Sequence, residues 1–284
     1  MKEIVVLSGK GGTGKTTVTA SLAALAKNAV LADCDVDAAD LYLLLKPEIK
    51  ETFEFWGSQK AKINENKCKE CGKCEEVCRF GAIENFKVNA ILCEGCRVCC
   101  NLCPQKAIDM VETLSGHWYI SDTKYGPMVH ASLGIAEENS GRLVSVVKKT
   151  AREIAERERY EYIITDGPPG IGCPVISSLA GADMALIVTE PTAAGLHDLE
   201  RVLKLAENFK VAIKVVINKF DLAQEKSKEI EQYCINKGIE VIGKIPFDEE
   251  IVRAVSKGVP PVEYSSGPAA EVLKNVAILS FGKS

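Results

Sequence analysis

A glycine-rich segment near the N-terminus has the residues and the spacing of a phosphate-binding loop. Residues 8–17 read Ser-Gly-Lys-Gly-Gly-Thr-Gly-Lys-Thr-Thr, which contains the pattern G-x-x-x-x-G-K-[ST]. Glycines let consecutive backbone N–H groups point inward, while Lys15 can reach the β- and γ-phosphates and the Thr16 hydroxyl can bind Mg²⁺. The expected nucleotide-binding residues of this loop are Gly9, Lys10, Gly11, Gly12, Thr13, Gly14, Lys15, Thr16 and Thr17.

The segments on either side of the loop support this interpretation. The preceding residues 2–7 form a short apolar run typical of a buried parallel strand, and Val18 to Lys27 are rich in alanine and leucine, which favour a helix. A helix N-terminus also offers partial positive charge to an anion. The alternative, a glycine-rich turn without a ligand, does not explain the strand–loop–helix context.

Eight of the twelve cysteines form two copies of one run, C-x2-C-x2-C-x3-C, placed 25 residues apart. The pattern is typical of bacterial ferredoxins with two [4Fe–4S] clusters, in which the last cysteine of each run ligates the other cluster. We therefore expect one cluster on Cys68, Cys71, Cys74 and Cys103, and a second cluster on Cys93, Cys96, Cys99 and Cys78.

Zinc is the alternative occupant, because C-x2-C pairs also make zinc sites. The duplication continues past the cysteines, since Ala82-Ile83 recurs as Ala107-Ile108, and this favours the ferredoxin repeat. Arg79 stands where a proline usually follows the last cysteine, and Cys100 is left over beside Cys99. Neither departure removes a cluster ligand.

Polar residues follow three other apolar runs, where parallel strands would end at one edge of a sheet. Asp33 and Asp35 follow residues 29–32, Asp166 follows residues 162–165, and Asn218 follows residues 213–217. An aspartate after a hydrophobic strand is the Walker B pattern, so Asp166 joins Thr16 as an expected Mg²⁺ ligand. The amide of Asn218 could pair with an edge of adenine.

Lys10 and the segment Asp166-Gly-Pro-Pro-Gly170 carry a family resemblance. A second lysine early in the loop resembles the P-loop of the MinD/ParA/Mrp and nitrogenase-iron-protein ATPases, and D-x-P-P-G resembles switch II of the Mrp/MinD group. The resemblance implies that Lys10 contacts phosphates of the facing subunit in an ATP-bound homodimer and that the Gly170 amide senses the γ-phosphate. It also places a switch I aspartate near Asp35, which we expect to orient the attacking water, with Asp33 and Asp40 as weaker candidates. The expected catalytic residues are thus Lys10, Lys15 and Asp35.

Composition narrows the class of protein. The chain has 284 residues and a net charge of −4, which argues against non-specific nucleic-acid binding. No apolar run reaches the roughly 18 residues of a membrane span, and no signal peptide precedes the first strand, so we expect a cytoplasmic protein without stable membrane association. Cys173, three residues after Gly170, is expected to be a buried, inert thiol, with a place near the dimer interface as the alternative.

These features predict an α/β fold with a mostly parallel P-loop sheet and helices on both faces, plus an inserted two-cluster ferredoxin domain. The expected segments are residues 1–59 and 117–284 for the ATPase and 60–116 for the ferredoxin domain. The expected function is Mg²⁺-dependent ATP hydrolysis that couples dimer switching to electron transfer with an unidentified redox partner. Alternatives are an Mrp-type cluster carrier that serves an apo-protein, and a redox-sensing regulatory ATPase of the MinD/ParA type.

Overall fold

The computed structural model describes residues 1–134 and 140–282. Their contacts divide the chain into two units. Unit 1 contains Met1–Thr52, Trp118–Ser132 and Ser140–Ser284, and unit 2 contains Phe53–His117 and Leu133–Asn139.

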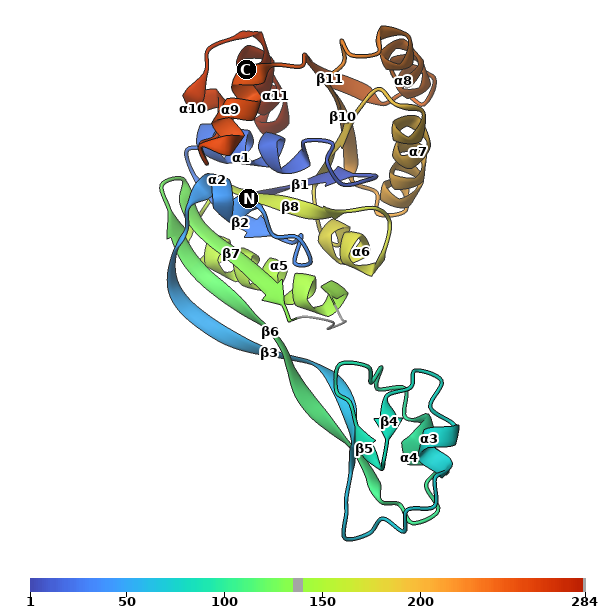
Figure 1. The fold of residues 1–284 in the computed structure, drawn as a ribbon. Helices are drawn as coiled ribbons and strands as arrows, with labels where there is room; N and C mark the ends of the chain where they lie inside the picture. The colour runs from blue at the N-terminus through green and yellow to red at the C-terminus, as the bar shows by residue number, and fades with distance from the viewer. Residues whose placement is uncertain (135–139, 283–284) are drawn as a thin grey trace. The chain divides into compact units, whose positions relative to one another are not determined.

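A nine-stranded sheet organises the fold (Figure 1). Every pairing from β11 through β7 is parallel, which confirms the predicted α/β fold and its mostly parallel sheet. From one edge to the other, the strands are β11 (Glu240–Ile245), β10 (Ala212–Asn218), β9 (Met184–Thr189), β1 (Lys2–Ser8), β8 (Tyr162–Pro169), β2 (Ala29–Asp33), β7 (Gly126–Leu133), β6 (Ile108–Thr123) and β3 (Glu48–Ile63).

Helices of unit 1 cover both faces of this sheet (Figure 1). Residues of α1, α2 and α11 belong to one hydrophobic core, and residues of α6, α7 and α8 belong to the other. The helices are α1 (Lys15–Leu25), α2 (Leu41–Leu45), α5 (Ser140–Glu158), α6 (Cys173–Leu179), α7 (Ala193–Glu207), α8 (Gln224–Asn236), α9 (Glu249–Ser256), α10 (Pro261–Tyr264) and α11 (Pro268–Phe281). None of the helices in the described residues is long and apolar enough to cross a membrane.

Strand β1 shows why the sheet has two cores. Successive side chains of a strand point to opposite faces. Ile4 and Val6 therefore join the core on the side of α1, whereas Val5 and Leu7 join the core on the side of α7. All four side chains are fully buried. The apolar run near the N-terminus, in which no polar residues alternate with apolar ones, predicts such a central strand.

The long strands β3 and β6 were not predicted at their full length. Each has 16 residues, and each continues from unit 1 into unit 2. The predicted segment boundaries at 59/60 and 116/117 fall within these two strands. Strand β3 lies at the edge of the sheet and carries several lysines and glutamates, a composition that suits an exposed edge but hides a strand from hydrophobic pattern analysis.

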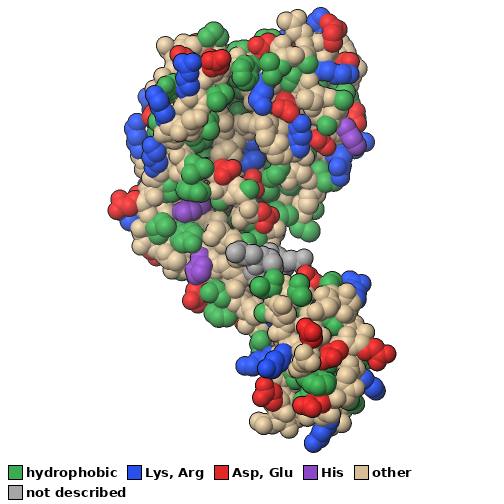
Figure 2. Space-filling view, viewed as in Figure 1, with side chains coloured by type: hydrophobic (Ala, Val, Ile, Leu, Met, Phe, Trp, Pro, Cys, Tyr) green, Lys and Arg blue, Asp and Glu red, His purple; other side chains and the backbone are tan. Residues whose placement is uncertain are grey.

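Unit 2 also contains short elements that hold the cysteine runs in place. They are α3 (Lys73–Glu76), β4 (Ile83–Glu84), β5 (Lys87–Val88) and α4 (Val98–Leu102). Ala61, Ile83, Cys99 and Ile108 form its small buried core, and five further cysteines pack against this core. On the face shown in Figure 2, basic and acidic side chains of the described residues are interspersed.

His130 on β7 gives the fold a testable pH dependence. Its ring is 8% exposed, stacks on Tyr119 and hydrogen-bonds to Ser121 Oγ at 2.9 Å, and burial lowers its pKa from 6.5 to about 4. The unfolded chain therefore binds more protons between these values, so the free energy of unfolding should fall by about 3 kcal/mol as the pH drops from 6.5 to 4. Chemical denaturation across this range measures the slope.

His130→Gln should flatten that part of the profile, because glutamine does not titrate there. His197→Gln is the matched control, since His197 is exposed on α7. A profile that stays as steep in His130→Gln as in the wild-type protein would assign the acid sensitivity to other groups.

Candidate functional site

The loop between β1 and α1 lines a cavity of about 420 Å³. Gly12 and Gly14 adopt left-handed backbone conformations, with φ of +80° and +92°, that glycine reaches without strain. Helix α1 begins at Lys15, so its N-terminal N–H groups face this loop. The cavity is lined by Ser8, Gly11, Gly12, Gly14, Lys15, Thr16, Thr17, Asp35, Ala38, Asp40, Leu43, Leu44, Pro169 and Val255.

Lys15 is the central cation of the cavity. Its Nζ lies 2.9 Å from Asp166 Oδ1 and 3.4 Å from Asp35 Oδ2, and the side chain is only 6% exposed. Burial alone would lower the pKa of Lys15, but the charges of Asp166 and Asp35 outweigh burial and raise it. Lys15 is therefore a permanent positive charge at the place where the sequence predicts the phosphates.

Asp166 in the second half of β8 is held by three donors from the same helix. It accepts hydrogen bonds from Thr16 Oγ1 and Thr19 Oγ1, each at 2.7 Å, and it pairs with Lys15. The side chain is fully buried. The structure thus brings together Thr16 and Asp166, the two residues expected to bind Mg²⁺.

Asp33 and Asp35 at the end of β2 add two more carboxylates. Asp33 is fully buried, and its Oδ1 accepts the Asp35 N–H at 3.1 Å, while its Oδ2 has no hydrogen-bond partner among the described residues. Burial raises the pKa of Asp33 well above its usual range, and the charge of Asp166 adds to this rise. Burial also raises the pKa of Asp35, against the charge of Lys15.

Three carboxylates and a threonine hydroxyl around one lysine form a set of hard oxygen donors. Oxygen ligands of this kind are the ones that Mg²⁺ prefers in proteins, and Asp33 Oδ2 is a buried oxygen without a hydrogen-bond partner among the described residues. The residues therefore fit a magnesium ion. Thr16 and Asp166 would hold it, since the described residues contain no group of three or more Cys, His, Asp or Glu side chains that could hold a metal ion.

Lys10 does not point into the cavity with Lys15. Its Nζ lies 2.6 Å from Glu190 Oε1, and Lys219 Nζ lies 3.3 Å from the other oxygen of the same carboxylate. Gly9, directly before Lys10, packs against α7, because a Cβ at Gly9 would lie 2.4 Å from Asp198 Cβ. Close packing against α7 thus explains why position 9 is a glycine. Lys10 has a partner in its own chain that the sequence did not indicate.

Asn218 supports the P-loop directly. Its Nδ2 donates to the Thr13 carbonyl at 2.8 Å, and its Oδ1 accepts the Lys219 N–H at 3.0 Å. The expected pairing with adenine can use only the remaining amide hydrogen and the free lone pair. A second cavity of about 260 Å³ is lined by Gly12, Gly14, Thr17, Val18, Asn218, Lys219, Ile245, Ile251, Val252, Val255, Ser256 and Leu273.

Gly170, at the end of the D-x-P-P-G segment, has a φ of +91° and open space around its Cα. Its N–H donates to the Ser8 carbonyl at 2.9 Å. This hydrogen bond links the segment after β8 to the start of the P-loop. The Gly170 amide can reach a phosphate only after that bond opens.

The eight repeated cysteines lie in two groups of four in unit 2, although no such group among the described residues is arranged to hold a metal ion. Cys68, Cys71, Cys74 and Cys103 line one small cavity of unit 2 together with Lys69 and Lys73. Burial raises the pKa of the Cys99 thiol, and the nearby Cys93, Cys96 and Cys78 thiols add to this rise. Each quartet therefore contains three cysteines of one run and the last cysteine of the other.

Backbone N–H groups point at a sulfur in both quartets. The Sγ atoms of Cys68, Cys103, Cys93 and Cys78 each accept such a bond, at 3.3 to 3.5 Å. Cys100 differs, because its Sγ donates to the Ile108 carbonyl at 2.9 Å. Cys173 lies at the start of α6 in unit 1 and is exposed, so the expected burial of its thiol was wrong.

Comparison with known proteins decides the family. The model of the CobQ/CobB/MinD/ParA nucleotide binding domain matches residues 4–262, which include the P-loop, Asp35, Asp166 and Asn218. The chain belongs to this family. It is a P-loop ATPase of the MinD/ParA type.

Relatives of this ATPase align over most of its length. An uncharacterised protein of Methanocaldococcus jannaschii is 34% identical over 257 residues, which cover 89% of this chain and 87% of the relative. The septum site-determining protein MinD of Thermotoga maritima is 27% identical over 267 residues, covering 90% and 79%. The solved MinD cell division protein of Aquifex aeolicus has a TM-score of 0.59 at 24% identity, covers 100% of this chain and 98% of its own, and shares the fold.

These findings bear on the expected function. They support the alternative of a regulatory ATPase of the MinD/ParA type better than electron transfer, because two of the proteins compared above are MinD proteins. The iron–sulfur function expected from the cysteine runs receives no support from them. It depends on the geometry of unit 2 alone.

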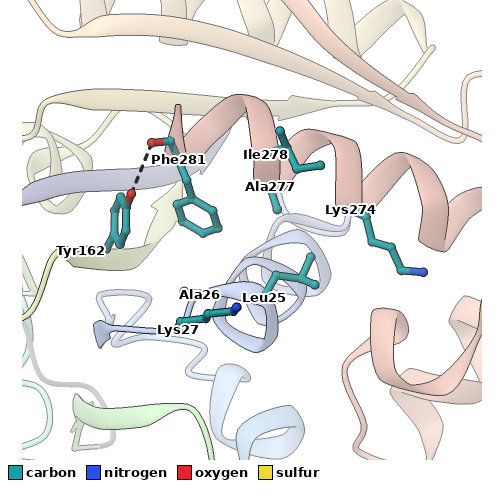
Figure 3. Close-up of a pocket in the computed structure, with 8 residues that line it drawn as sticks. All are labelled: Leu25, Ala26, Lys27, Tyr162, Lys274, Ala277, Ile278 and Phe281. Atoms are coloured by element: carbon teal, nitrogen blue, oxygen red, sulfur yellow. Dashed lines mark hydrogen bonds between the residues drawn. The ribbon is translucent and has the colours of Figure 1, made fainter. Parts of the chain in front are cut away.

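Another cavity in the ATPase, of about 380 Å³, lies beside the end of α1 and α11 (Figure 3). Its lining is largely apolar, and Tyr162 donates a hydrogen bond to the Phe281 carbonyl at 3.4 Å within it. Lys27 and Lys274 provide the charged groups of the lining. The lining residues are Leu25, Ala26, Lys27, Tyr162, Lys274, Ala277, Ile278 and Phe281, and none of them belongs to the P-loop site.

The sequence analysis did not identify two residues that contact residues of the P-loop. Thr19 lies one helical turn after Lys15 and hydrogen-bonds to Asp166, so its spacing on a predicted helix was an available signal. Glu190 directly follows β9, and the apolar run that precedes it was an available signal, as the apolar run 162–165 was for Asp166. Only its side-chain contacts with Lys10 and Lys219 distinguish it from an ordinary loop glutamate.

Proposed function

We propose that this ATPase is a nucleotide-driven dimerisation switch of the MinD/ParA type, in which bound ATP closes a homodimer and hydrolysis opens it. The observation that carries the proposal is the convergence of Lys15, Thr16, Asp35 and Asp166 on one cavity beside the P-loop. Lys10, within that loop, supplies a second cation that a single-chain nucleotide site does not require.

Triphosphate binding would redistribute the charges of the cavity. Lys15 would leave its carboxylate partners for the β- and γ-phosphates, so Asp35 and Asp166 would lose their compensating cation. Mg²⁺ held by Thr16 and Asp166 would supply the missing positive charge and neutralise the phosphates. The same exchange explains why ATP and Mg²⁺ should bind together rather than separately.

Hydrolysis would depend on Asp35 and the two lysines. Asp35 reaches the cavity from the end of β2 and would orient the attacking water, while Lys15 would stabilise charge on the phosphates. Lys10 would act across the dimer interface. The apolar side chains around Asn218 would bind the base, with the Asn218 amide offering one free N–H.

Lys10→Ala tests the dimeric switch. The variant should bind MgADP as the wild-type chain does, but it should stay monomeric with AMPPNP and lose roughly a hundredfold or more in kcat, because the cation that bridges the subunits is gone. Analytical ultracentrifugation and a steady-state ATPase assay measure the two effects. A Lys10→Ala chain that dimerises and hydrolyses ATP normally would refute a role across the interface.

A second function concerns unit 2. We infer that its two quartets hold two [4Fe–4S] clusters, because each quartet combines cysteines of both runs and receives two N–H···S bonds, which tune clusters of this kind. The clusters would serve as a redox input to the switch, with electron delivery or cluster transfer to a partner protein as further outputs. ATPase assays with the clusters oxidised and reduced test the coupling, and equal rates in both states would exclude a redox sensor.

A further inference from the structure

The carboxylate of Glu190 bridges two lysines from different loops. Lys10 Nζ lies 2.6 Å from one oxygen, and Lys219 Nζ lies 3.3 Å from the other. The Glu190 side chain is 15% exposed and each lysine is 34% exposed, so the cluster is partly shielded from water. Neither the nucleotide cavity nor the core explains this arrangement, because Glu190 lines neither of them.

The sheet puts Glu190 between its two partners. Strand β9 pairs with β1 on one side and with β10 on the other, through Leu7↔Ile187 and Ile217↔Thr189. Glu190 follows β9 directly, Lys10 follows β1, and Lys219 follows β10. The three residues therefore lie close together, because the carboxyl ends of these three neighbouring parallel strands lie side by side.

The backbone around Glu190 is fixed. Its carbonyl accepts the Thr192 N–H at 2.8 Å, and Thr192 caps α7 by accepting the Gly195 N–H. Gly195 packs so closely that a Cβ there would lie 2.2 Å from the Glu190 carbonyl oxygen. The Glu190 carboxylate thus extends from a hydrogen-bonded and closely packed turn.

The charge state supports an ion pair. Burial alone would raise the pKa of Glu190, but the hydrogen bonds and charges of Lys10 and Lys219 outweigh burial and lower it. Glu190 is consequently ionised at neutral pH, and Lys10 is bound to an anion of its own chain.

We propose that Glu190 is a positioning residue that holds Lys10 on its own subunit, so that the pair must open before Lys10 can reach the nucleotide of a facing subunit. This inference rests on the proposed dimer switch. The ion pair then sets the ATP concentration at which the dimer forms, because each subunit gives up its Glu190–Lys10 contact on association. Partly exposed pairs of this type shift an equilibrium by roughly two- to fivefold.

Removing Lys219 should have the opposite effect on dimerisation from removing the charge of Glu190. It shares the negative charge of Glu190 with Lys10, so removing it leaves Lys10 as the main cation on that carboxylate. Lys219→Met should therefore hold Lys10 more firmly and raise the nucleotide concentration needed for dimerisation. A purely structural role of the cluster would instead shift both variants in the same direction.

The experiment titrates the full-length chain with Mg-AMPPNP and follows the dimer by analytical ultracentrifugation. Glu190→Gln should reduce the Mg-AMPPNP concentration at which half of the chain is dimeric, by roughly two- to fivefold for each Glu190–Lys10 pair. The KM for ATP should fall by the same factor, and kcat should not change. Glu190→Asp, which keeps the charge on a shorter side chain, should lie between Glu190→Gln and wild type. Glu263→Gln is the matched control, since Glu263 also pairs with a lysine, Lys124, away from the site.

Affinity for MgADP separates effects on the pocket from effects on dimerisation, because Lys219 also lines the second cavity. The inference is overturned if Glu190→Gln dimerises at the wild-type concentration, or if Glu190→Gln and Lys219→Met shift it in the same direction. Lys10→Ala distinguishes this failure from failure of the dimer switch. If Lys10→Ala blocks dimerisation while Glu190→Gln changes nothing, only the role of Glu190 is wrong.

Discussion

Replacing Lys15 with alanine should abolish ATP hydrolysis, with a fall in kcat of about a thousandfold or more. Lys15 is the only lysine among the residues that line the P-loop cavity of the described chain, and its ammonium group lies within 3.4 Å of both Asp35 and Asp166. Without it, a triphosphate would face buried carboxylates that repel it. A steady-state ATPase assay and a binding titration with MgATP measure the loss.

The same substitution should also change stability, which calls for a control. Removing one partner of a buried ion pair leaves an uncompensated charge and typically costs about 3–5 kcal/mol. Thermal unfolding must therefore show that Lys15→Ala is folded at the assay temperature. Lys46→Ala, at an exposed lysine directly after α2, should retain activity. Hydrolysis by folded Lys15→Ala within tenfold of the wild-type rate would contradict the assigned role.

The nucleotide site was largely predictable because most of its geometry is determined by residues that are close together in the sequence. A buried strand, a loop with two positive-φ glycines and a helix that starts at Lys15 are adjacent in the chain, so their geometry follows from a few residues. Asp35 and Asp166 are far apart in sequence, but each comes after an apolar run, residues 29–32 and 162–165. Parallel strands place their carboxyl ends at one edge, and this rule brought the two aspartates together in advance of the structure.

Features that depend on strand order or on side-chain partners were not predictable. The contact of Lys10 with Glu190 requires β9 to lie beside β1, and the sequence of neither segment indicates that the two strands are neighbours. Asn218 likewise hydrogen-bonds to the Thr13 carbonyl because β10 ends near the P-loop. Strand β3 escaped because its charged side chains suit an exposed edge, where hydrophobic periodicity is weak.

Replacing Cys99 with serine should remove about half of the iron bound by the chain, since one cluster would lose a ligand while the other keeps all four. Cys99 lies beside Cys93, Cys96 and Cys78 and packs in the small core of unit 2. Serine is a poor cluster ligand because its hydroxyl remains protonated at neutral pH, whereas a thiol is readily deprotonated by the metal. Iron and sulfide analysis after anaerobic purification, with electron paramagnetic resonance of the reduced protein, measures the change.

Cys100→Ser provides a matched control at the next residue. The Cys100 thiol donates to the Ile108 carbonyl, and a serine hydroxyl can make the same bond, so the iron content should stay at the wild-type level. Both variants replace a sulfur in α4 with oxygen, so they should have similar effects on folding. A difference in their iron content therefore reports the loss of a cluster ligand. Equal iron content in the two variants, or zinc in place of iron and sulfide in the wild-type chain, would show that the quartets do not hold the proposed clusters. ATP-dependent dimerisation would then stand as the function of this chain without a redox component.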